Sequence, residues 1–424
     1  MTRAPAEAYL PGQRRILVLS WLAYLLAYTL RLNFSVVIPA LVAARHYTYA
    51  QMGLVTSLYF VFYMFGQLIN GYLGDHVSSR RLVVCGLAVS ALCNLGLIFA
   101  PSLAVIIVCW SLNGLAQSML WAPLMRTLSL WFDCRRLGQV SFLMSLTAIF
   151  GYFLSWGSSS LLINHLGWQA VFYLPAGLAL LFTVILGLQF QNQPPEATIP
   201  IAADGGACEL PEKKGGDRLP VRSYFRIIRL PSLLLLAMLQ GLIREGIGVW
   251  FPTILQSSSR YAAASSWLVL AAVPIINLGG ILLVRNLNRR LGGDSNRTIL
   301  QVFILTAGFA LFMILLPAQG FWLILLAMIL MLALSSGLTP VLTSVIPFQY
   351  ARFGRVALTA GILDFAIYCG AAVTSLASGL IADRYEWNGV MILWLAAAVA
   401  GLLLALRRKL QNPDQARQEQ ALQD

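Results

Sequence analysis

Residues 28–39 read YTLRLNFSVVIP and place Arg31 inside a run of apolar residues that is long enough to cross a bilayer. Residues 244–252 repeat the pattern 213 positions later as REGIGVWFP, again with a proline eight residues after the arginine. A guanidinium in the middle of a bilayer costs at least about 2.5–3.5 kcal/mol on insertion scales, so such residues normally face an internal cavity and serve a function. Matching arginines in two halves of a chain indicate a binding site at a repeat interface.

The composition is that of a membrane protein. Of the 424 residues, 59% are hydrophobic and only 11% are charged, whereas a soluble protein carries about 25% charged residues. The chain contains a series of apolar runs, each near the ~20 residues that cross the hydrocarbon core. They fall at residues 16–41, 52–74, 82–100, 103–125, 138–163, 168–190, 231–256, 265–285, 298–317, 320–347, 356–382 and 387–406. We therefore predict an all-α membrane protein with twelve transmembrane helices.

The apolar runs form two groups of six. Residues 1–190 are the predicted N-terminal half, and residues 231–424 are the C-terminal half with a cytoplasmic tail. Residues 191–230 are expected to be a flexible cytoplasmic linker that ends in a short amphipathic helix at 224–230. A shared pattern, W-[QN]-x-V-x-x-L, begins at two places 219 positions apart and supports a repeat. Two six-helix pseudo-repeats joined by a basic linker resemble the major facilitator fold.

The net charge of +13 comes from arginines and lysines that gather on one side of the predicted membrane. If both termini lie in the cytoplasm, the inner segments hold 24 of the 29 basic residues and the outer loops hold three. The positive-inside rule then places both termini in the cytoplasm of a bacterial-type inner membrane. This distribution explains the charge without a nucleic-acid partner.

Residues 71–81, between the second and third runs, read GYLGDHVSSRR and resemble the signature loop of major facilitator proteins, G-x-x-x-D-R/K-x-x-x-R-R. Gly71 permits close approach of helices, and the carboxylate of Asp75 can cap a neighbouring helix and pair with Arg80 or Arg81 in one conformation. These four residues are the predicted gating elements. The alternative is an ordinary solvated turn, and a histidine replaces the usual basic residue after the aspartate.

A finer resemblance is to the organophosphate:phosphate antiporter family, which includes glycerol-3-phosphate and hexose-phosphate transporters. It covers nearly the whole chain and is weakest in the linker. The stretches that carry it are RLNF and the following residues at 31–39, LNGLAQ at 112–117 with WAP at 121–123, residues 244–252, and residues 360–370. In that family the arginines of the first and seventh spans bind the substrate phosphate, so the resemblance implies this role for Arg31 and Arg244.

The chemistry of arginine agrees with an anion site, because a buried guanidinium stays charged and its planar fork of donors suits oxyanions. Tyr24 and Tyr28 lie seven and three positions before Arg31 and share its helical face. The family has tyrosines at these two positions and at those of Tyr63 and Tyr368. Two alternatives stay open: the arginines pair with internal carboxylates, and the tyrosines belong to the core or to the interface belt.

Several positions depart from the family pattern. Leu32 stands where the antiporters have a second basic residue, Gln67 aligns with a lysine, and Thr147 aligns with a histidine. Two carboxylates instead appear inside spans: Asp364, and Glu245, which points about 100° around the helix from the adjacent arginine. A buried carboxyl can exchange a proton as a cavity opens and closes, so both are candidate proton-coupling residues. The alternative is that each neutralises an arginine.

Polar side chains also form stripes on the predicted helices. Gln67 lies on one face of the second span, Asn113 and Gln117 lie one turn apart in the fourth, and Thr147 lies in the fifth. These four residues join the arginines and tyrosines as candidate substrate-binding residues. The alternative is that the amides form hydrogen bonds between helices and do not contact substrate.

No sequence motif for ATP binding, for a metalloprotease or for a nucleophilic hydrolase occurs, so we expect no enzyme, no catalytic residue, no cofactor and no metal site. The sequence predicts a secondary active transporter that moves a small polar organic anion or zwitterion, such as a sugar phosphate or sugar acid, by alternating access. Proton coupling and phosphate exchange both remain open. A transporter-like receptor that senses an external anion is the alternative from a different class. Membrane lipid is the other expected partner, and the chain is expected to be a monomer.

Overall fold

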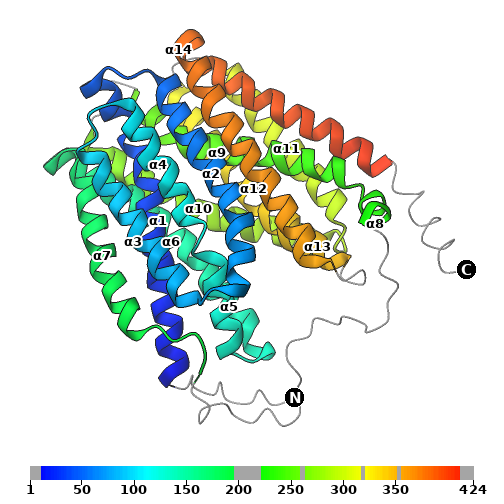
Figure 1. Cartoon of the computed structure of the whole chain (residues 1–424). Coiled ribbons are helices and arrows are strands. Elements are labelled where there is room, and N and C mark those ends of the chain that lie inside the picture. Colours follow the sequence, from blue (N-terminus) through cyan, green and yellow to red (C-terminus); the bar gives the residue numbers. More distant parts are fainter. Residues whose placement is uncertain (1–10, 195–220, 258–262, 317–319, 351–354, 411–424) are drawn as a thin grey trace, which may run out of the picture. The chain divides into compact units, whose positions relative to one another are not determined.

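The computed structural model describes residues 11–194, 221–257, 263–316, 320–350 and 355–410. Within these ranges every regular element is a helix (Figure 1). The N-terminal part of the chain contains α1 Pro11–Arg45, α2 Tyr49–His76, α3 Ser79–Ile98, α4 Leu103–Gln117, α5 Trp121–Trp131, α6 Cys134–Leu166 and α7 Ala170–Gln189. The remainder contains α8 Val221–Ile227, α9 Leu230–Ser257, α10 Ala263–Arg290, α11 Ser295–Leu315, α12 Phe321–Pro340, a π-helix Val341–Val345, α13 Ile346–Gln349 and α14 Val356–Leu410.

The predicted membrane spans are present as helices. By length and composition, 11 helical stretches of the described residues can cross a membrane. The longest, Leu358–Leu410, contains the eleventh and twelfth predicted spans, because the chain breaks helical geometry only at Glu386 (φ 55°, ψ −165°). Counted as two spans, this stretch agrees with the predicted twelve.

The fourth predicted span is divided into α4 and α5. Pro123 lies in the first turn of α5, where its missing N–H costs nothing. Because proline has no N–H, Pro123 cannot form the helical hydrogen bond to the carbonyl of Met119, four residues earlier. Residues 118–120, between the two helices, form turns. The proline therefore ends one helix and begins the next without ending the span, which is continuous from Leu103 to Trp131.

The chain divides into two compact units. The first unit is Met1–Phe34 with Phe65–Leu210, and the second is Ser35–Met64 with Pro211–Asp424. The boundaries of the predicted repeat halves, at residues 190 and 231, stay a prediction. The expected linker falls largely on residues 195–220, which lie outside the described ranges.

The first unit buries one continuous apolar core. Its members come from α1, α3, α5, α6 and α7, for example Leu30, Val83, Leu124 and Met144. The opposite face of α7 carries large apolar side chains that are between 60% and 78% exposed: Leu178, Leu181, Val184 and Leu188. An exposed apolar stripe at helical spacing is what a lipid-facing surface requires.

In the second unit, α9 packs along α14, and glycines permit the close approach. A Cβ atom at Gly241 would overlap the carbonyl oxygen of Ile367, and one at Gly370 would overlap that of Met238. Small residues at such crossings let two membrane helices come into backbone contact. This crossing positions the next turn of α9, which carries Arg244.

The first turn of α2 also belongs to the second unit. The backbone N–H groups of Tyr49 and Ala50 donate to the two carboxylate oxygens of Asp383 in α14, at 2.9 and 2.8 Å. These N–H groups have no partner within their own helix, and a carboxylate is favourable at a helix N-terminus. Asp383 thus caps α2 from a different helix.

The predicted amphipathic helix at 224–230 is observed as α8, displaced toward the N-terminus. It ends at Ile227 because the backbone of Arg229 adopts a left-handed conformation (φ 50°), which turns the chain into α9. Tyr224 of α8 is buried, and its hydroxyl lies 2.6 Å from that of Thr359 in α14. Burial raises the pKa of this tyrosine.

Candidate substrate-binding site

Arg31 lies in the middle of α1 and is partly buried. The rings of Tyr24 and Tyr28, on the preceding turns of the same helix, meet edge to face with centroids 5.2 Å apart. The ring centroid of Tyr24 also lies 4.9 Å from that of Trp121 in α5, and the ring centroid of Tyr28 lies 6.1 Å from that of Tyr152 in α6. The first unit therefore gathers aromatic side chains on the turns that lead to Arg31.

Asn113 and Gln117 of α4 hold the turn of α1 that precedes Arg31. The Asn113 amide donates to the carbonyl of Leu30 at 3.0 Å, and the Gln117 amide donates to the carbonyl of Ala27 at 3.0 Å. Both side chains are buried, and both also bond to the Ser90 hydroxyl. This arrangement matches the alternative in which the amides join helices. Their position makes them supports for the arginine-bearing turn.

Gln67 and Thr147 lie in the first unit and contribute differently. Thr147 is fully buried in α6, and its hydroxyl donates to the carbonyl of Met144 in the same helix. Gln67 is partly buried in α2, three residues before the buried Asn70. Neither side chain carries the positive charge found at the corresponding family position.

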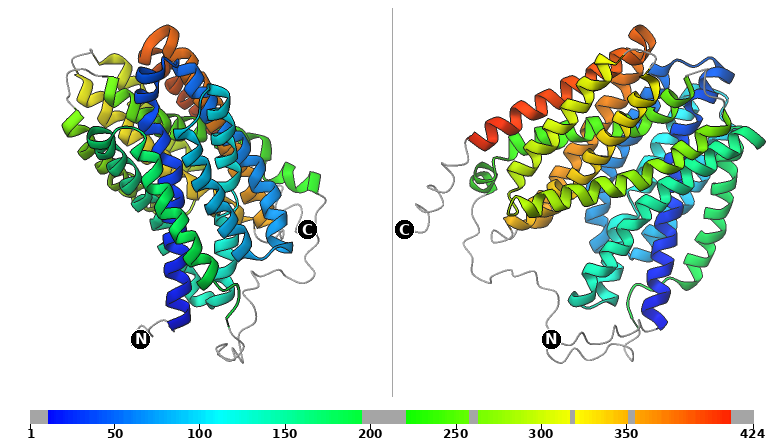
Figure 2. Two further views of the ribbon diagram at one scale, coloured as in Figure 1. Left: turned by 60° about the vertical axis from the view of Figure 1, so that its left-hand side comes forward. Right: turned by 180° about the vertical axis from the view of Figure 1, so that it is seen from behind.

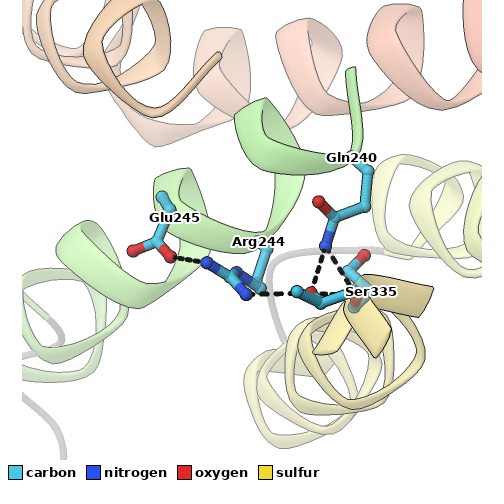
Figure 3. A network of polar contacts seen from close by, with 5 residues as sticks. Gln240, Arg244, Glu245 and Ser335 are labelled. Atoms are coloured by element: carbon cyan, nitrogen blue, oxygen red, sulfur yellow. Dashed lines mark hydrogen bonds and ion pairs between the residues drawn. The ribbon is translucent and has the colours of Figure 1, made fainter. Parts of the chain in front are cut away.

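Arg244 of α9 is held from two sides in the second unit (Figure 3). One of its terminal nitrogens forms an ion pair with the adjacent Glu245, and the other donates to the hydroxyl of Thr339 in α12 at 2.8 Å. Gln240, one turn earlier in α9, donates to the same hydroxyl at 2.9 Å and to the carbonyl of Ser335 at 2.7 Å. The carboxylate and the hydroxyl thus fix the orientation of the guanidinium.

Sequence reasoning missed Gln240, Ser335 and Thr339. Gln240 lies four residues before Arg244, and Ser335 and Thr339 lie four residues apart in α12. Polar pairs one turn apart inside apolar runs were therefore the available signal. That signal identifies polar faces of helices, but it does not say which two faces meet.

The structure brings together two of the predicted tyrosines in the second unit. The rings of Tyr63 in α2 and Tyr368 in α14 lie 4.7 Å apart, and Phe60 lies 6.0 Å from Tyr368. Asp364 is partly buried on α14, one turn before Tyr368 and on the same helical face. The predicted carboxylate thus lies next to a predicted substrate-binding tyrosine.

The predicted gating residues lie at the junction of α2 and α3. Gly71 and Asp75 are in the last turns of α2, where the structure describes the backbone alone. Arg80 and Arg81 are exposed in the first turn of α3, and the Arg80 N–H donates to Asn192 at 2.8 Å. An ion pair of Asp75 with either arginine stays a prediction.

The groups found in the two units suit an oxyanion. Each unit supplies a partly buried arginine, and each holds a pair of candidate tyrosines: Tyr24 and Tyr28 in the first unit, Tyr63 and Tyr368 in the second. Charged donors of this kind bind carboxylate and phosphate oxygens through short, strong hydrogen bonds. In the part of the chain that the structure describes, no three histidine, cysteine, aspartate or glutamate side chains are grouped as metal ligands.

Known proteins resemble this chain over nearly its full length. It is 21% identical over 410 residues to a probable hexose phosphate transport protein of Chlamydia pneumoniae, and the alignment covers 92% of this chain and 90% of that protein. It is 22% identical over 443 residues to the membrane sensor protein UhpC of Escherichia coli (strain K12), with 98% and 99% covered. It is 23% identical over 414 residues to the glycerol-3-phosphate transporter of Bacillus subtilis (strain 168), with 93% and 92% covered.

The fold is also that of solved membrane transporters. The nucleoside transporter NupG superposes with a TM-score of 0.69 at 15% identity, covering 94% of this chain and 98% of that one. The names of the relatives agree with the predicted resemblance to the organophosphate:phosphate antiporter family, and none of the three is named as an enzyme. Residues 20–352 match the sequence family described as the Major Facilitator Superfamily. The chain belongs to the Major Facilitator Superfamily.

Proposed function

We propose that the chain is a secondary transporter for a small polar organic anion and that Arg31 and Arg244 both bind the anionic group. The observation that carries this proposal is the fixed guanidinium of Arg244, which an ion pair and a hydrogen bond orient inside an apolar span. A second arginine stands at the matching place of the sequence repeat. A guanidinium that is already oriented lowers the cost of ordering the site when the anion binds.

The relatives named as hexose phosphate and glycerol-3-phosphate transporters support a phosphate ester as the substrate class. The residues of this chain favour a lower charge. Leu32, Gln67 and Thr147 supply no positive group, and Glu245 already pairs with Arg244. We therefore propose an anion with one negative charge at the site, or a zwitterion, such as a sugar acid or a singly ionised sugar phosphate.

The first test uses uptake into proteoliposomes. Ligands are found first by thermal shift of the purified chain with sugar phosphates, sulfonates, sugar acids and amino acids, since a bound ligand raises apparent stability. We expect Arg31→Lys and Arg244→Lys each to abolish uptake of the ligand found, because lysine keeps the charge and loses the fork. Arg289→Lys, at an exposed position of α10, is the matched control. Near-normal uptake by either site variant would contradict the proposal.

Proton coupling is the proposed driving reaction, with Asp364 as the favoured carrier. Asp364 lies on the face of α14 that also carries the candidate substrate-binding residue Tyr368, and Glu245 forms an ion pair with Arg244. Protonation of Asp364 would lower the negative charge of the site and favour binding of a monoanion. We expect Asp364→Asn to exchange substrate across the membrane but not to concentrate it under an imposed pH gradient. Accumulation that requires internal phosphate and ignores the pH gradient would favour the antiporter alternative.

The proposed orientation places both termini in the cytoplasm, as the distribution of basic residues predicts. Position 45, at the end of α1, is partly exposed, and position 289, at the end of α10, is exposed. A cysteine at 45 should react with an impermeant thiol reagent added to intact cells, and one at 289 should not. The reverse pattern would overturn the orientation.

A receptor is the second candidate function. The membrane sensor protein UhpC covers 98% of this chain at 22% identity, comparable to the named transporters. A receptor binds its ligand without accumulating it. The receptor would be favoured if a ligand raises the stability of the chain in the thermal-shift assay but is never taken up by proteoliposomes, with or without a gradient.

A further inference from the structure

A basic cavity of about 530 Å³ lies in the second unit, and none of the candidate substrate-binding residues lines it. Its lining residues come from α8 and the turn after it, from the start of α9 and from the end of α14. Figures 1 and 2 show the course of these helices. Arg226, Arg229 and Arg407 line its polar side, and Leu235 and Leu404 line its apolar side. No role in the transport site accounts for this concentration of positive charge.

Arg408, also at this cavity, explains how the corner is built. It is buried, and its guanidinium donates to Asn296 at 2.7 Å, to the Ser232 hydroxyl at 2.6 Å and to the carbonyls of Ile228 and Arg229 at 3.0 and 3.2 Å. It therefore ties the end of α14 to the backbone of the turn that joins α8 to α9. Every one of these acceptors is uncharged.

Three of the arginines that line the cavity have no carboxylate partner among the described residues. Among the residues whose side chains the structure describes, no carboxylate forms an ion pair with Arg226, Arg407 or Arg408. A buried cation without a counter-ion is unfavourable, so such a site attracts an anion. The close spacing of further guanidiniums around Arg408 strengthens this preference.

The position of the cavity indicates where the anion comes from. Arg229 and Arg408 lie at the ends of two apolar spans, Leu230–Gln256 and Leu358–Leu410. Leu235 lies about 9 Å deeper than Arg229, and Leu404 about 6 Å deeper than Arg408, at ~1.5 Å per helical residue. The cavity is thus charged at the level of lipid headgroups and apolar toward the hydrocarbon core. A soluble anion would use only the charged end.

We infer that this cavity binds an anionic phospholipid. The phosphodiester lies against Arg226, Arg229 and Arg407, and an acyl chain lies along Leu235 and Leu404. Guanidinium forks match phosphate oxygens, and basic pockets at the ends of transmembrane helices suit acidic headgroups. Occupation would hold α8 against α9 and α14, because the ligand contacts all three helices.

The test compares lipid binding by the purified full-length chain in native mass spectrometry. The probes are dioleoylphosphatidylglycerol, dioleoylphosphatidylcholine and glycerophosphoglycerol, the deacylated headgroup. In Arg226→Gln/Arg407→Gln we expect phosphatidylglycerol affinity to fall about tenfold or more, since each surface arginine contributes about 1 kcal/mol toward anionic lipid. Both side chains are exposed and form no ion pair in the described structure, so the variant should keep its unfolding temperature.

The matched control is Arg289→Gln/Arg290→Gln, which removes two exposed arginines from the end of α10. We expect less than a twofold change for this variant. An equal loss in both double variants would show a diffuse charge effect and overturn the site. Equal binding of phosphatidylcholine by the wild type would overturn the anionic preference. Deacylated headgroup or inorganic phosphate bound as tightly as phosphatidylglycerol would assign the cavity to a soluble anion.

Discussion

The helix crossings beside Arg31 and Arg244 occupy matching places in the repeat but are packed differently. In the first unit, Tyr28 of α1 lies over Gly151 of α6, where a Cβ atom would overlap the tyrosine side chain. In the second unit, the position 213 residues after Tyr28 is Gly241, and the position 219 residues after Gly151 is Gly370. Both glycines there contact backbone atoms of the facing helix. One crossing holds a polar ring, and the other brings two backbones together.

The residues around the two arginines also differ: polar rings lie near Arg31, and a carboxylate lies beside Arg244. Tyr28 and Tyr24 lie on the turns before Arg31, whereas Arg244 has Glu245 beside it. The residue that corresponds to Glu245 in the first half is Leu32. A repeat can therefore keep its helix geometry while the residue after the arginine is a carboxylate in one copy and an apolar side chain in the other. The second unit supplies an arginine that is paired with a carboxylate near a tightly packed crossing, and the first supplies an arginine with two tyrosines on the preceding turns.

The largest loss of stability is expected from placing larger side chains at the crossing of α9 and α14. Gly241→Leu or Gly370→Leu would force side-chain atoms into backbone of the partner helix, and overpacking costs about 1–3 kcal/mol or more. We expect little folded protein by size-exclusion chromatography in detergent. Gly279→Leu, whose Cβ meets nothing within 4 Å, is the control. Gly151→Ala should be milder, because alanine adds a single carbon atom, which meets the Cβ of Tyr28. Normal folding of Gly370→Leu would break the comparison.

A smaller effect is expected from removing the counter-ion. Glu245→Gln keeps the side-chain shape but frees the Arg244 charge for substrate. A hydrogen bond to a charged group is worth about 1.5–3 kcal/mol, so we expect about a tenfold shift in competition assays toward doubly charged over singly charged substrates. Leu32→Gln, at the matching position of α1, should leave the charge preference unchanged. An unchanged preference in Glu245→Gln would show that the pair does not select substrate charge.

The smallest effects concern the hydrogen bonds that hold each arginine turn. Asn113→Leu removes the donor to Leu30 in the first unit, and Thr339→Val removes the acceptor of Arg244 in the second. We expect a loss of about 1 kcal/mol for the neutral bond and somewhat more for the charged one, seen as lower unfolding temperatures in detergent. If Asn113→Leu destabilises the chain more than Thr339→Val, the α1 turn depends on its polar support more than the comparison implies.

Sequence reasoning recovered most of the architecture because membrane spans have a simple signature. Apolar length predicted every span, and the short helix before α9 was predicted within three residues. The division at Pro123 and the continuity through Glu386 were not predicted, since both depend on how turns at the ends of helices are completed.

The candidate site was less accessible to prediction. Arg31, Arg244 and the tyrosines stand out as polar residues in apolar runs, but the partners Gln240 and Thr339 depend on which faces of α9 and α12 meet. The 100° separation of Arg244 and Glu245 also proved a weak guide to contact. A long guanidinium side chain can reach a carboxylate on the adjacent residue despite that angle.

The break at Glu386 has a consequence for how the chain is made. Asp364 would raise the cost of moving its span out of the translocon by about 2.5–3.5 kcal/mol, whereas residues 387–406 contain no charged side chain. Because Glu386 alone departs from helical geometry between the two spans, the turn that joins them is short. We expect them to enter the bilayer as one hairpin during synthesis. The last span then helps to insert the one that carries the carboxylate.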